Sequence, residues 1–418
     1  MSEKIYMGGV CGMGMAPLAA FMKLDGMDVS GFDDAPNPDA QKMLEERGVA
    51  VRRAPAGERF DRIVISSALR TRAGELAAEF PGAKVELRGQ AWAKICAARR
   101  LVAVVGSHGK STVSAMAAQA AALSGENFGW LIGAFPRGFP MLGHCKTGDV
   151  LISEIDESDA TIELFSPEVC VALNSDLDHV DTYADKSEML KMFERLFSRT
   201  GRAVVYPESD AELGRLAAAS GLDAYPVKLS DDFTKTNLNF ARAACEAAFG
   251  KTFGDEAFGA FKGLARRQEV LADLPGFFAI SDYAHHPREL DSFLKWIQKR
   301  RPGKLTMIFQ PHRYTRTKRF AAEFAEILDA CARRGNDVLL LPVYPASEPF
   351  DPEGESRKIS EKSANIKLAR AKDACDAILR AAESRNGASF AIVGAGDFHF
   401  EAKSLIESIK FQRKDTTT

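Results

Sequence analysis

The chain has 418 residues, 46% of them hydrophobic, which predicts about two to four domains with buried cores. Its 55 lysines and arginines nearly balance 57 aspartates and glutamates, which excludes a global charge field that attracts nucleic acid or an anionic membrane. The sequence has no signal-peptide core, and no stretch approaches the roughly 18 uncharged apolar residues of a membrane span. Seven scattered cysteines without metal-finger spacing are typical of reduced thiols. We therefore expect a cytoplasmic protein that binds neither nucleic acid nor membranes.

Residues 1–98 predict a first α/β domain. Strands are expected at 5–10 and 27–34, with a glycine-rich turn and a helix between them, and further strands at 61–69 and 83–87 close a small doubly wound sheet. A glycine turn followed by an acid at the end of the next strand is typical of nucleotide binding. Cys11 stands where the second glycine is usual, so a tight turn of small residues is the alternative. The candidate binding residues are Gly9, Gly12, Gly14 and Asp33.

Residues 99–270 predict a second domain that begins with strand, glycine loop and helix. The apolar run 101–105 stops at Gly106, and an alanine-rich helical pattern follows Lys110. Such a loop directs backbone N–H groups and a helix dipole at phosphate oxygens, while the lysine adds charge and a hydroxyl ligates Mg²⁺. Val104 replaces the first glycine of the full pattern, so a plain strand-to-helix turn is the alternative. The candidate nucleotide site comprises Gly106, Ser107, His108, Gly109, Lys110, Ser111 and Thr112.

Acidic residues follow two further apolar strands of this domain. Because open α/β sheets bind ligands at the carboxyl ends of their strands, we favour metal binding over a merely solvated loop. Adjacent arginines at 266 and 267 are usually surface charges, yet a fixed guanidinium suits a transferring phosphate. The first group is Glu154, Asp156, Glu157 and Asp159, and the second combines the acids Asp176, Asp178 and Asp181 with Asn174 and His179.

Residues 271–418 predict a third domain of alternating strands and helices. Strands expected at 277–284, 304–310, 337–345 and 388–396 indicate a parallel sheet with right-handed crossovers. The motifs Asp282–Pro287 and Gln310–Arg316 both lie just beyond strand ends. The clustering of histidines in the motifs named so far predicts an active site completed at a domain junction.

These motifs resemble the Mur ligase family, the ATP-dependent amide-forming enzymes of bacterial cell-wall synthesis, over nearly the whole chain. The segments are SEIDESDA, NSDLDHVDTY, SDYAHHP and FQPHRYTRT, with VISSAL and SGFDD in the first domain. They are most similar to members that join UDP-N-acetylmuramate to L-alanine, although GVCG and RRxE are also similar to recycling members that add a whole tripeptide. The resemblance implies an N-terminal Rossmann-like UDP-binding domain, a central P-loop ATPase-like domain and a C-terminal Rossmann-like domain, in a monomer or weak homodimer.

The resemblance also implies roles for individual residues. Lys110 and Arg267 would contact phosphate, and Ser111, Glu157 and His179 would organise Mg²⁺. Asp282 and Asn239 would hold ATP, while Ser66 and the first glycine turn would hold UDP. The amino-acid pocket would comprise Tyr283, His285, His312, Arg313 and Arg316, with His285 and His179 as candidate bases.

The implied reaction has two steps. ATP phosphorylates the carboxylate of the sugar nucleotide, and the amine of alanine then attacks the acyl phosphate. Two departures support an alternative, a ligase-derived UDP-sugar-binding protein with weak turnover. Aligned on Asn239, only one asparagine of the family's His-Asn-x-x-Asn turn is present, and the stretch between Val205 and this helix is short.

Overall fold

The computed structural model describes residues 2–415 except 55–56, 157–160, 177–182, 184, 347 and 385–386. These residues form three sheets, so the predicted α/β class is confirmed. The chain divides into two compact units, Met1–Lys262 and Gly263–Thr418. The predicted boundaries at 98 and 270 stay predictions; the second falls inside strand β13 (Glu269–Leu274). Among the described residues, no helix has both the length and the apolarity to cross a bilayer.

The first sheet of unit one is parallel and covered on both faces. β1 alternates its side chains, with Ile5 and Met7 in the core beneath α1 and Tyr6 in a second core with Leu76 of α3. Strands buried on both faces read as apolar runs, which is why the sequence pattern identified them. The strand order is β3 (Ala50–Val51), β2 (Asp28–Phe32), β1 (Lys4–Gly8), β4 (Arg62–Ile65) and β5 (Lys84–Leu87), with helices α1 (Met15–Leu24), α2 (Pro38–Glu46), α3 (Ala73–Glu79) and α4 (Arg88–Ala97).

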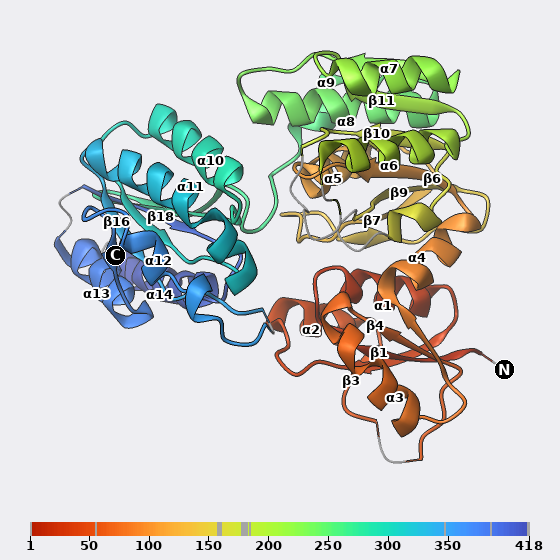
Figure 1. The fold of residues 1–418 in the computed structure, drawn as a ribbon, viewed down its shortest axis with the longest axis horizontal. Coiled ribbons are helices and arrows are strands. Elements are labelled where there is room, and N and C mark those ends of the chain that lie inside the picture. The colour runs from red at the N-terminus through yellow and green to blue at the C-terminus, as the bar shows by residue number, and fades with distance from the viewer. Residues whose placement is uncertain are drawn as a thin grey trace. The chain divides into compact units, whose positions relative to one another are not determined.

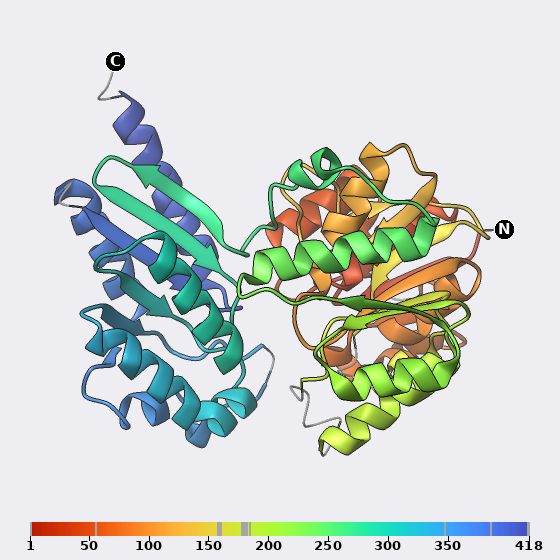
Figure 2. The same cartoon turned by 90° about the horizontal axis from the view of Figure 1, so that it is seen from above.

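The second sheet of unit one carries the glycine loop. Helix α8 lies over this sheet as the long green helix of Figure 2 and packs against α5, whose buried face is mostly alanine. Small side chains allow this close approach. The order is β12 (Asp223–Val227), β11 (Ala203–Pro207), β10 (Val169–Ala172), β6 (Arg100–Val105), β9 (Val150–Glu154), β7 (Phe128–Leu131) and β8 (Leu142–Gly143), with α5 (Lys110–Leu123), α6 (Lys186–Ser198), α7 (Ala211–Ser220), α8 (Phe233–Phe249) and α9 (Asp255–Gly259).

The two sheets of unit one share a core and a polar junction. Side chains of α1, α4, β6 and α6 belong to one continuous apolar cluster. Asp25, after α1, accepts a hydrogen bond from Arg99 Nη2 at 2.7 Å, and its Oδ1 lies 2.6 Å from His144 Nε2. Trp92 Nε1 donates to Ser153 Oγ at 3.2 Å. The first glycine turn and the glycine loop thus belong to one compact unit.

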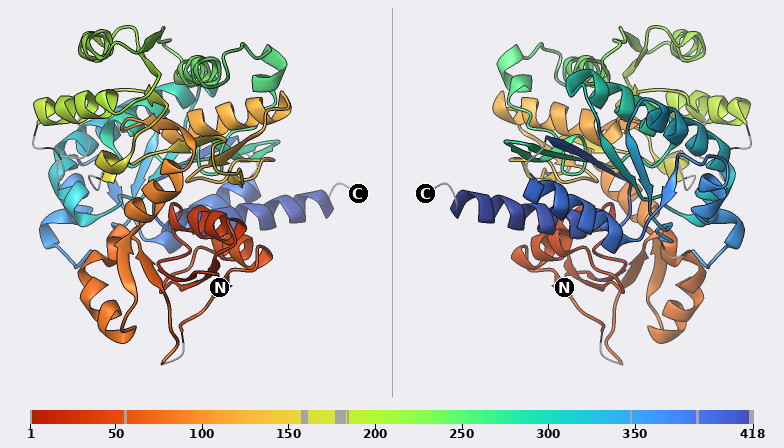
Figure 3. Two further views of the ribbon diagram at one scale, coloured as in Figure 1. Left: turned by 90° about the vertical axis from the view of Figure 1, so that its right-hand side faces the viewer. Right: turned by 90° about the vertical axis from the view of Figure 1, so that its left-hand side faces the viewer.

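The sheet of unit two lies between two helical layers. Helices α10 (Pro287–Arg300) and α11 (Tyr314–Arg333) cover one face, and α13 (Ala371–Ser384) and α14 (Phe398–Asp415) cover the other (Figure 1). Helix α14, dark blue in Figure 3, runs to the C-terminus. The order is β13, β14 (Phe277–Asp282), β18 (Ala388–Val393), β15 (Thr306–Phe309), β16 (Asp337–Leu340) and β17 (Lys367–Leu368), beside the short helix α12 (Arg357–Ser360).

The prediction of a wholly parallel third sheet is wrong at one edge. β13 pairs antiparallel with β14. The two strands are joined by a tight turn at Gly276, where φ is +70°, a conformation that glycine adopts without a steric penalty. The expected strand–helix alternation holds from β14 onward. The parallel strands β14, β18 and β15 therefore present their carboxyl ends at one edge.

A buried polar pair links β14 to α14. Ser281 Oγ lies 2.7 Å from His399 Nδ1, and both residues are almost wholly buried. Burial lowers the pKa of His399 to about 3. The ring is therefore neutral in the folded protein at neutral pH, whereas an exposed imidazole titrates near pH 6.5.

We predict that His399 makes the second unit sensitive to acid. Below pH 6.5 the His399 ring is protonated in the unfolded chain but stays neutral in the folded protein. The free energy of unfolding therefore falls as the pH falls. From pH 7 to pH 5 this residue accounts for a loss of about 2 kcal/mol. The acid-induced loss should be smaller by that amount in His399→Gln, measured by hydrogen exchange of β14 and β18 peptides across a urea series. Equal losses in the two proteins would contradict the prediction.

Candidate active site

The first glycine turn is held by an acid and crowded by a serine. Asp33 accepts the backbone N–H groups of Cys11 and Ala35, each at 3.0 Å, so both of its oxygens stabilise the turn. Gly9 has φ of +72°, and a Cβ there would lie 2.8 Å from Ser66 Oγ. The structure thus brings Gly9, Asp33 and Ser66 together at the ends of β1, β2 and β4.

An arginine that the sequence analysis missed lies beside this turn. Gly14 precedes α1, and a Cβ on it would lie 3.2 Å from Arg88 Nη1. Arg88 Nη2 also lies 3.8 Å from Asp156 Oδ2. The N–H of Gly12 donates to the carbonyl of Gly9 at 3.0 Å. Because Arg88 follows β5 directly, attention to strand ends could have found it.

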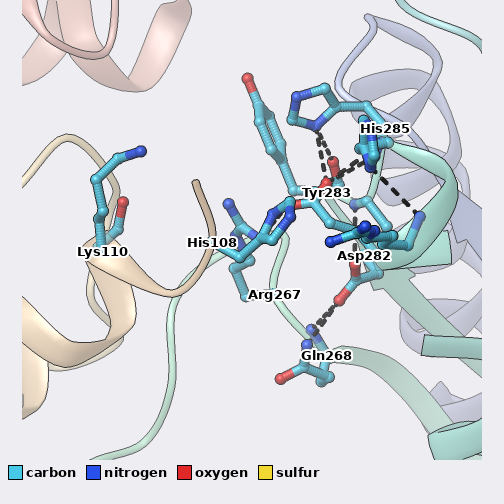
Figure 4. Close-up of polar contacts among 12 residues, drawn as sticks. His108, Lys110, Arg267, Gln268, Asp282, Tyr283 and His285 are labelled. Atoms are coloured by element: carbon cyan, nitrogen blue, oxygen red, sulfur yellow. Dashed lines mark hydrogen bonds and ion pairs between the residues drawn. The ribbon is translucent and has the colours of Figure 1, made fainter. Parts of the chain in front are cut away.

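The glycine loop adopts a conformation that only small residues fit. Gly106 and Gly109 have φ of +120° and +87°, and a Cβ on Gly106 would lie 3.1 Å from the backbone nitrogen of Asn174. Lys110, the first residue of α5, donates from Nζ to the Gly106 carbonyl at 2.7 Å. Figure 4 shows the Lys110 side chain beside its loop. The first turn of α5 also contains Ser111 and Thr112, and the other four predicted residues, Gly106 to Gly109, form the loop before it.

Asn174 clamps the glycine loop from the end of β10. Its Oδ1 accepts the N–H of Ser107 at 2.9 Å, and its Nδ2 donates to the carbonyl of His108 at 3.1 Å. Ser107 Oγ donates to the carbonyl of Asp176 at 2.5 Å. These hydrogen bonds shape the loop whose backbone N–H groups an anion cradle requires.

A carboxylate lies beside the predicted metal-binding hydroxyl. Ser111 Oγ donates to Glu154 Oε2 at 2.6 Å, and the N–H of Gly133 donates to the other oxygen of Glu154. The predicted ligands Glu157 and His179 lie outside the described residues. Within the described ranges, no group of three or more His, Cys, Asp or Glu side chains is arranged to hold a metal. Ser111 and Glu154 are thus the oxygen donors that the structure brings together.

The two asparagines of α8 have different surroundings. Asn237 Oδ1 lies 3.0 Å from the position of a Cβ on Gly109, so this amide packs against the glycine loop. Asn239, the residue assigned to ATP from the sequence, donates from Nδ2 to the carbonyl of Lys228 at 3.0 Å. The structure therefore brings Asn237, rather than Asn239, to the loop.

In unit two, a strained loop carries the arginine pair. Arg266 has φ of +60°, and its Nη2 donates to the carbonyls of Gly394 at 2.9 Å and Gly396 at 2.7 Å. Its guanidinium carbon also lies 4.8 Å from the centre of the Tyr283 ring. Arg266 thus anchors the loop, while the guanidinium carbon of Arg267 lies 5.4 Å from the same ring.

Asp282, at the end of β14, holds the same loop through hydrogen bonds. Its Oδ2 accepts both the backbone N–H and the side-chain Nε2 of Gln268, each at 2.9 Å, and its Oδ1 accepts the N–H of Ala284 at 2.9 Å (Figure 4). The side chain is buried, and burial raises its pKa. The role predicted for Asp282 on an ATP ribose would require part of this arrangement to open.

Aromatic rings that follow three strands, β14, β15 and β16, form a contiguous row. The ring centres of Tyr283 and His285 are 5.4 Å apart, those of His285 and His312 are 5.9 Å apart, and His312 stacks on Tyr344 at 5.6 Å. Burial lowers the pKa of His285 well below its usual value. Burial, helped by Arg316 and Arg313, lowers the pKa of His312 to about 3. Both rings are therefore neutral at pH 7 and keep a lone pair for an N–H donor.

The two arginines of the second motif are placed differently. Arg313 Nε donates to Glu348 Oε1 at 2.7 Å, and Thr315 Oγ1 donates to the same oxygen at 2.7 Å. Arg316 Nη1 lies 3.4 Å from His312 Nδ1. Arg316 thus lies beside the row of rings, whereas Arg313 is paired with a carboxylate.

Comparison with known proteins gives consistent matches. A model described as "Mur ligase family, catalytic domain" matches residues 4–100. The UDP-N-acetylmuramate–L-alanine ligase of Kineococcus radiotolerans is 31% identical over 404 residues, covering 84% of this chain and 83% of the relative. The enzyme of the same name from Paenarthrobacter aurescens is 30% identical over 450 residues, covering 97% of each chain. The chain belongs to the Mur ligase family.

The fold agrees with this membership. A crystal structure of UDP-N-acetylmuramate–alanine ligase from Thermotoga maritima superposes with a TM-score of 0.77 at 20% identity, over 98% of this chain and 99% of the other. As a Mur ligase, the protein is an ATP-dependent ligase. The family resemblance found in the motifs is confirmed, while the roles of the individual residues stay predictions.

We predict that Asn237, and not Asn239, contributes to nucleotide affinity. Asn237→Ala should weaken binding of a non-hydrolysable ATP analogue about tenfold, the worth of one hydrogen bond. Asn239→Ala is the matched control, and its dissociation constant should change less than about twofold. Titration calorimetry gives both values. The reverse ranking would restore the sequence-based assignment.

Proposed function

We propose that this Mur ligase joins UDP-N-acetylmuramate to L-alanine, consuming ATP and passing through an acyl phosphate. The observation that carries the proposal is the strand-edge cluster of unit two, where neutral His285 and His312 stand with Arg316 and Tyr283. A guanidinium beside neutral imidazoles suits a small amino acid, since the arginine pairs with its carboxylate and the lone pairs accept N–H groups. The alanine-adding names of the curated relatives support the same substrate.

The phosphate-handling groups belong to the glycine loop. The loop N–H groups, the amino end of α5 and Lys110 would bind the ATP phosphates, with Arg267 adding positive charge during transfer. Ser111 and Glu154 fit Mg²⁺ because a hydroxyl and a carboxylate are its usual donors and already adjoin each other. When bound, Mg²⁺ neutralises charge on the transferring phosphoryl group. Glu157 and His179 remain further proposed ligands.

The sugar nucleotide is proposed to bind at the first glycine turn. Gly9, Gly12, Gly14 and Ser66 would approach the UDP phosphates closely, and Arg88 beside Gly14 would add positive charge to this site. Asp33 acts on this site by holding the turn through Cys11 and Ala35. The small-molecule substrates are thus assigned to separate strand edges.

In the amino-acid pocket, Arg316 is the first candidate for the carboxylate of alanine. Arg313, whose Nε donates to Glu348, is the second candidate, since its guanidinium carries further N–H groups. Because the pKa of His285 is low, its ring is suited to orient the amine as a hydrogen-bond acceptor rather than to remove the amine proton as a general base. Orientation of the amine toward the acyl phosphate then supplies a large share of the rate enhancement.

We predict that phosphate release requires free L-alanine. Purified protein with ATP, Mg²⁺ and UDP-N-acetylmuramate should release phosphate in step with added L-alanine and form the corresponding amide. A parallel reaction receives L-alanyl-γ-D-glutamyl-meso-diaminopimelate. Release with that tripeptide alone would replace the alanine-adding assignment with the recycling one. Binding of the sugar nucleotide without turnover on either would identify a ligase-derived binding protein.

We predict that Lys110→Ala abolishes turnover but not sugar-nucleotide binding. Loss of a charge directed at the transferring phosphate should lower kcat by about 100- to 1,000-fold. The dissociation constant of UDP-N-acetylmuramate, measured by calorimetry without ATP, should stay unchanged because the first glycine turn is intact. Full activity in the variant would contradict the assignment of the phosphate loop.

A further inference from the structure

Glu289 occupies an unusual position at the beginning of α10. It is the third helical residue, and its Oε2 accepts the backbone N–H groups of His285 at 3.1 Å and His286 at 3.4 Å. The same oxygen lies 3.3 Å from His285 Nδ1. The other oxygen, Oε1, lies 3.6 Å from Arg267 Nη1. One carboxylate, only 13% exposed, therefore contacts groups from two loops.

The contacts of His285 define which ring nitrogen carries the proton. Nδ1 lies 3.0 Å from the carbonyl of Tyr283 as well as 3.3 Å from Glu289. Both neighbours are acceptors, so Nδ1 is the donor and Nε2 holds the lone pair. Glu289 thus favours the tautomer that offers Nε2 to an N–H group.

We propose that Glu289 is a positioning residue for the ligase reaction, because it holds the amino-acid-binding His285 and the phosphate-binding Arg267 on a single carboxylate. The inference rests on the proposed function for the roles of those two residues. Oε2 sets the orientation of the ring, and Oε1 sets the position of the guanidinium. The ring that accepts from the amine and the guanidinium that contacts the acyl phosphate are thereby held at a fixed distance within unit two.

A capping role alone explains only half of these contacts. At the third position of a helix, glutamine caps as well as glutamate, because either side chain can accept the N–H of the residue before the helix. Glutamine, however, offers one acceptor oxygen and turns an NH₂ group toward its other neighbour. Because Oε2 makes both the cap contacts and the contact with the His285 ring, Glu289→Gln keeps all of these with its amide oxygen and places its NH₂ group against Arg267.

The test is steady-state kinetics of the full chain carrying Glu289→Gln. We expect kcat to fall about 10- to 100-fold, as for a small displacement of reacting groups. KM for L-alanine should rise, and KM for UDP-N-acetylmuramate should stay unchanged, since its proposed site lies in unit one. Glu289→Asp, which restores the charge with a shorter reach, should recover part of the rate.

A matched control separates positioning from helix stability. Asp291 is an exposed carboxylate on the same helix and pairs with Lys295 at 2.6 Å. Asp291→Asn should leave kcat, both KM values and thermal unfolding unchanged. Glu289→Gln should also unfold at the wild-type temperature, which would show that the lost rate is not lost structure.

A second readout does not depend on turnover. In protein labelled with ¹⁵N in its histidine rings, His285 should show the Nδ1-protonated tautomer in the wild type and in Glu289→Gln, whose amide oxygen remains an acceptor at Nδ1. A mixture is expected in Glu289→Ala, which removes that acceptor, and the signal is assigned by His285→Gln. If the wild type fails to use L-alanine, the proposed function fails while this spectrum still tests Glu289. A kcat of Glu289→Gln within twofold of wild type, or an unchanged His285 signal in Glu289→Ala, would overturn the inference.

Discussion

The candidate site depends on one repeated constraint, which is that backbone N–H groups at the strand ends must find acceptors. Asp33 accepts two of them in the first sheet, Asn174 one in the second and Asp282 two in the third. An unpaired buried N–H costs about 1–3 kcal/mol. Each acceptor therefore holds a loop in the conformation that presents its binding groups, before any ligand arrives.

The third of these acceptors shows the energetic balance most clearly. Burial raises the pKa of Asp282, which means that its charged form is costly there, and donation from Gln268 and Ala284 offsets that cost. The same bonds stabilise Gln268 at φ of +42° and, through the loop, Arg266 at +60°. Strain in the arginine loop is thus offset by the hydrogen bonds that the loop donates to the Asp282 carboxylate.

Much of this arrangement could be predicted from the sequence because its signals are local. A β-branched run that stops at Gly106 and continues as helix after Lys110 indicates a phosphate loop directly, and polar motifs just beyond apolar strands predicted the edge at which they lie. The antiparallel strand β13 escaped because its turn at Gly276 follows a run without strong alternation. The sequence did not predict roles for Arg88, Asn237 and Glu289, because their contacts join different elements and leave no local pattern.

The asparagines of α8 illustrate that limit. Asn237 and Asn239 are two positions apart, which is about 200° around a helix, so they face nearly opposite directions. Alignment on a motif cannot decide which one meets the glycine loop, but packing of α8 against α5 does.

The second motif shows how backbone geometry separates two arginines of similar sequence context. Arg313 precedes α11 with φ of +74° and ψ of 133°, a sparsely populated conformation that costs a non-glycine residue about 1–3 kcal/mol. Its N–H bond to the Tyr344 carbonyl at 2.8 Å and its ion pair with Glu348 offset this cost. Because Arg313 is held there, α11 begins in a fixed orientation and Arg316, one turn later, lies beside His312. The strained residue thus orients the helix through its backbone, and the helix in turn places Arg316 beside His312.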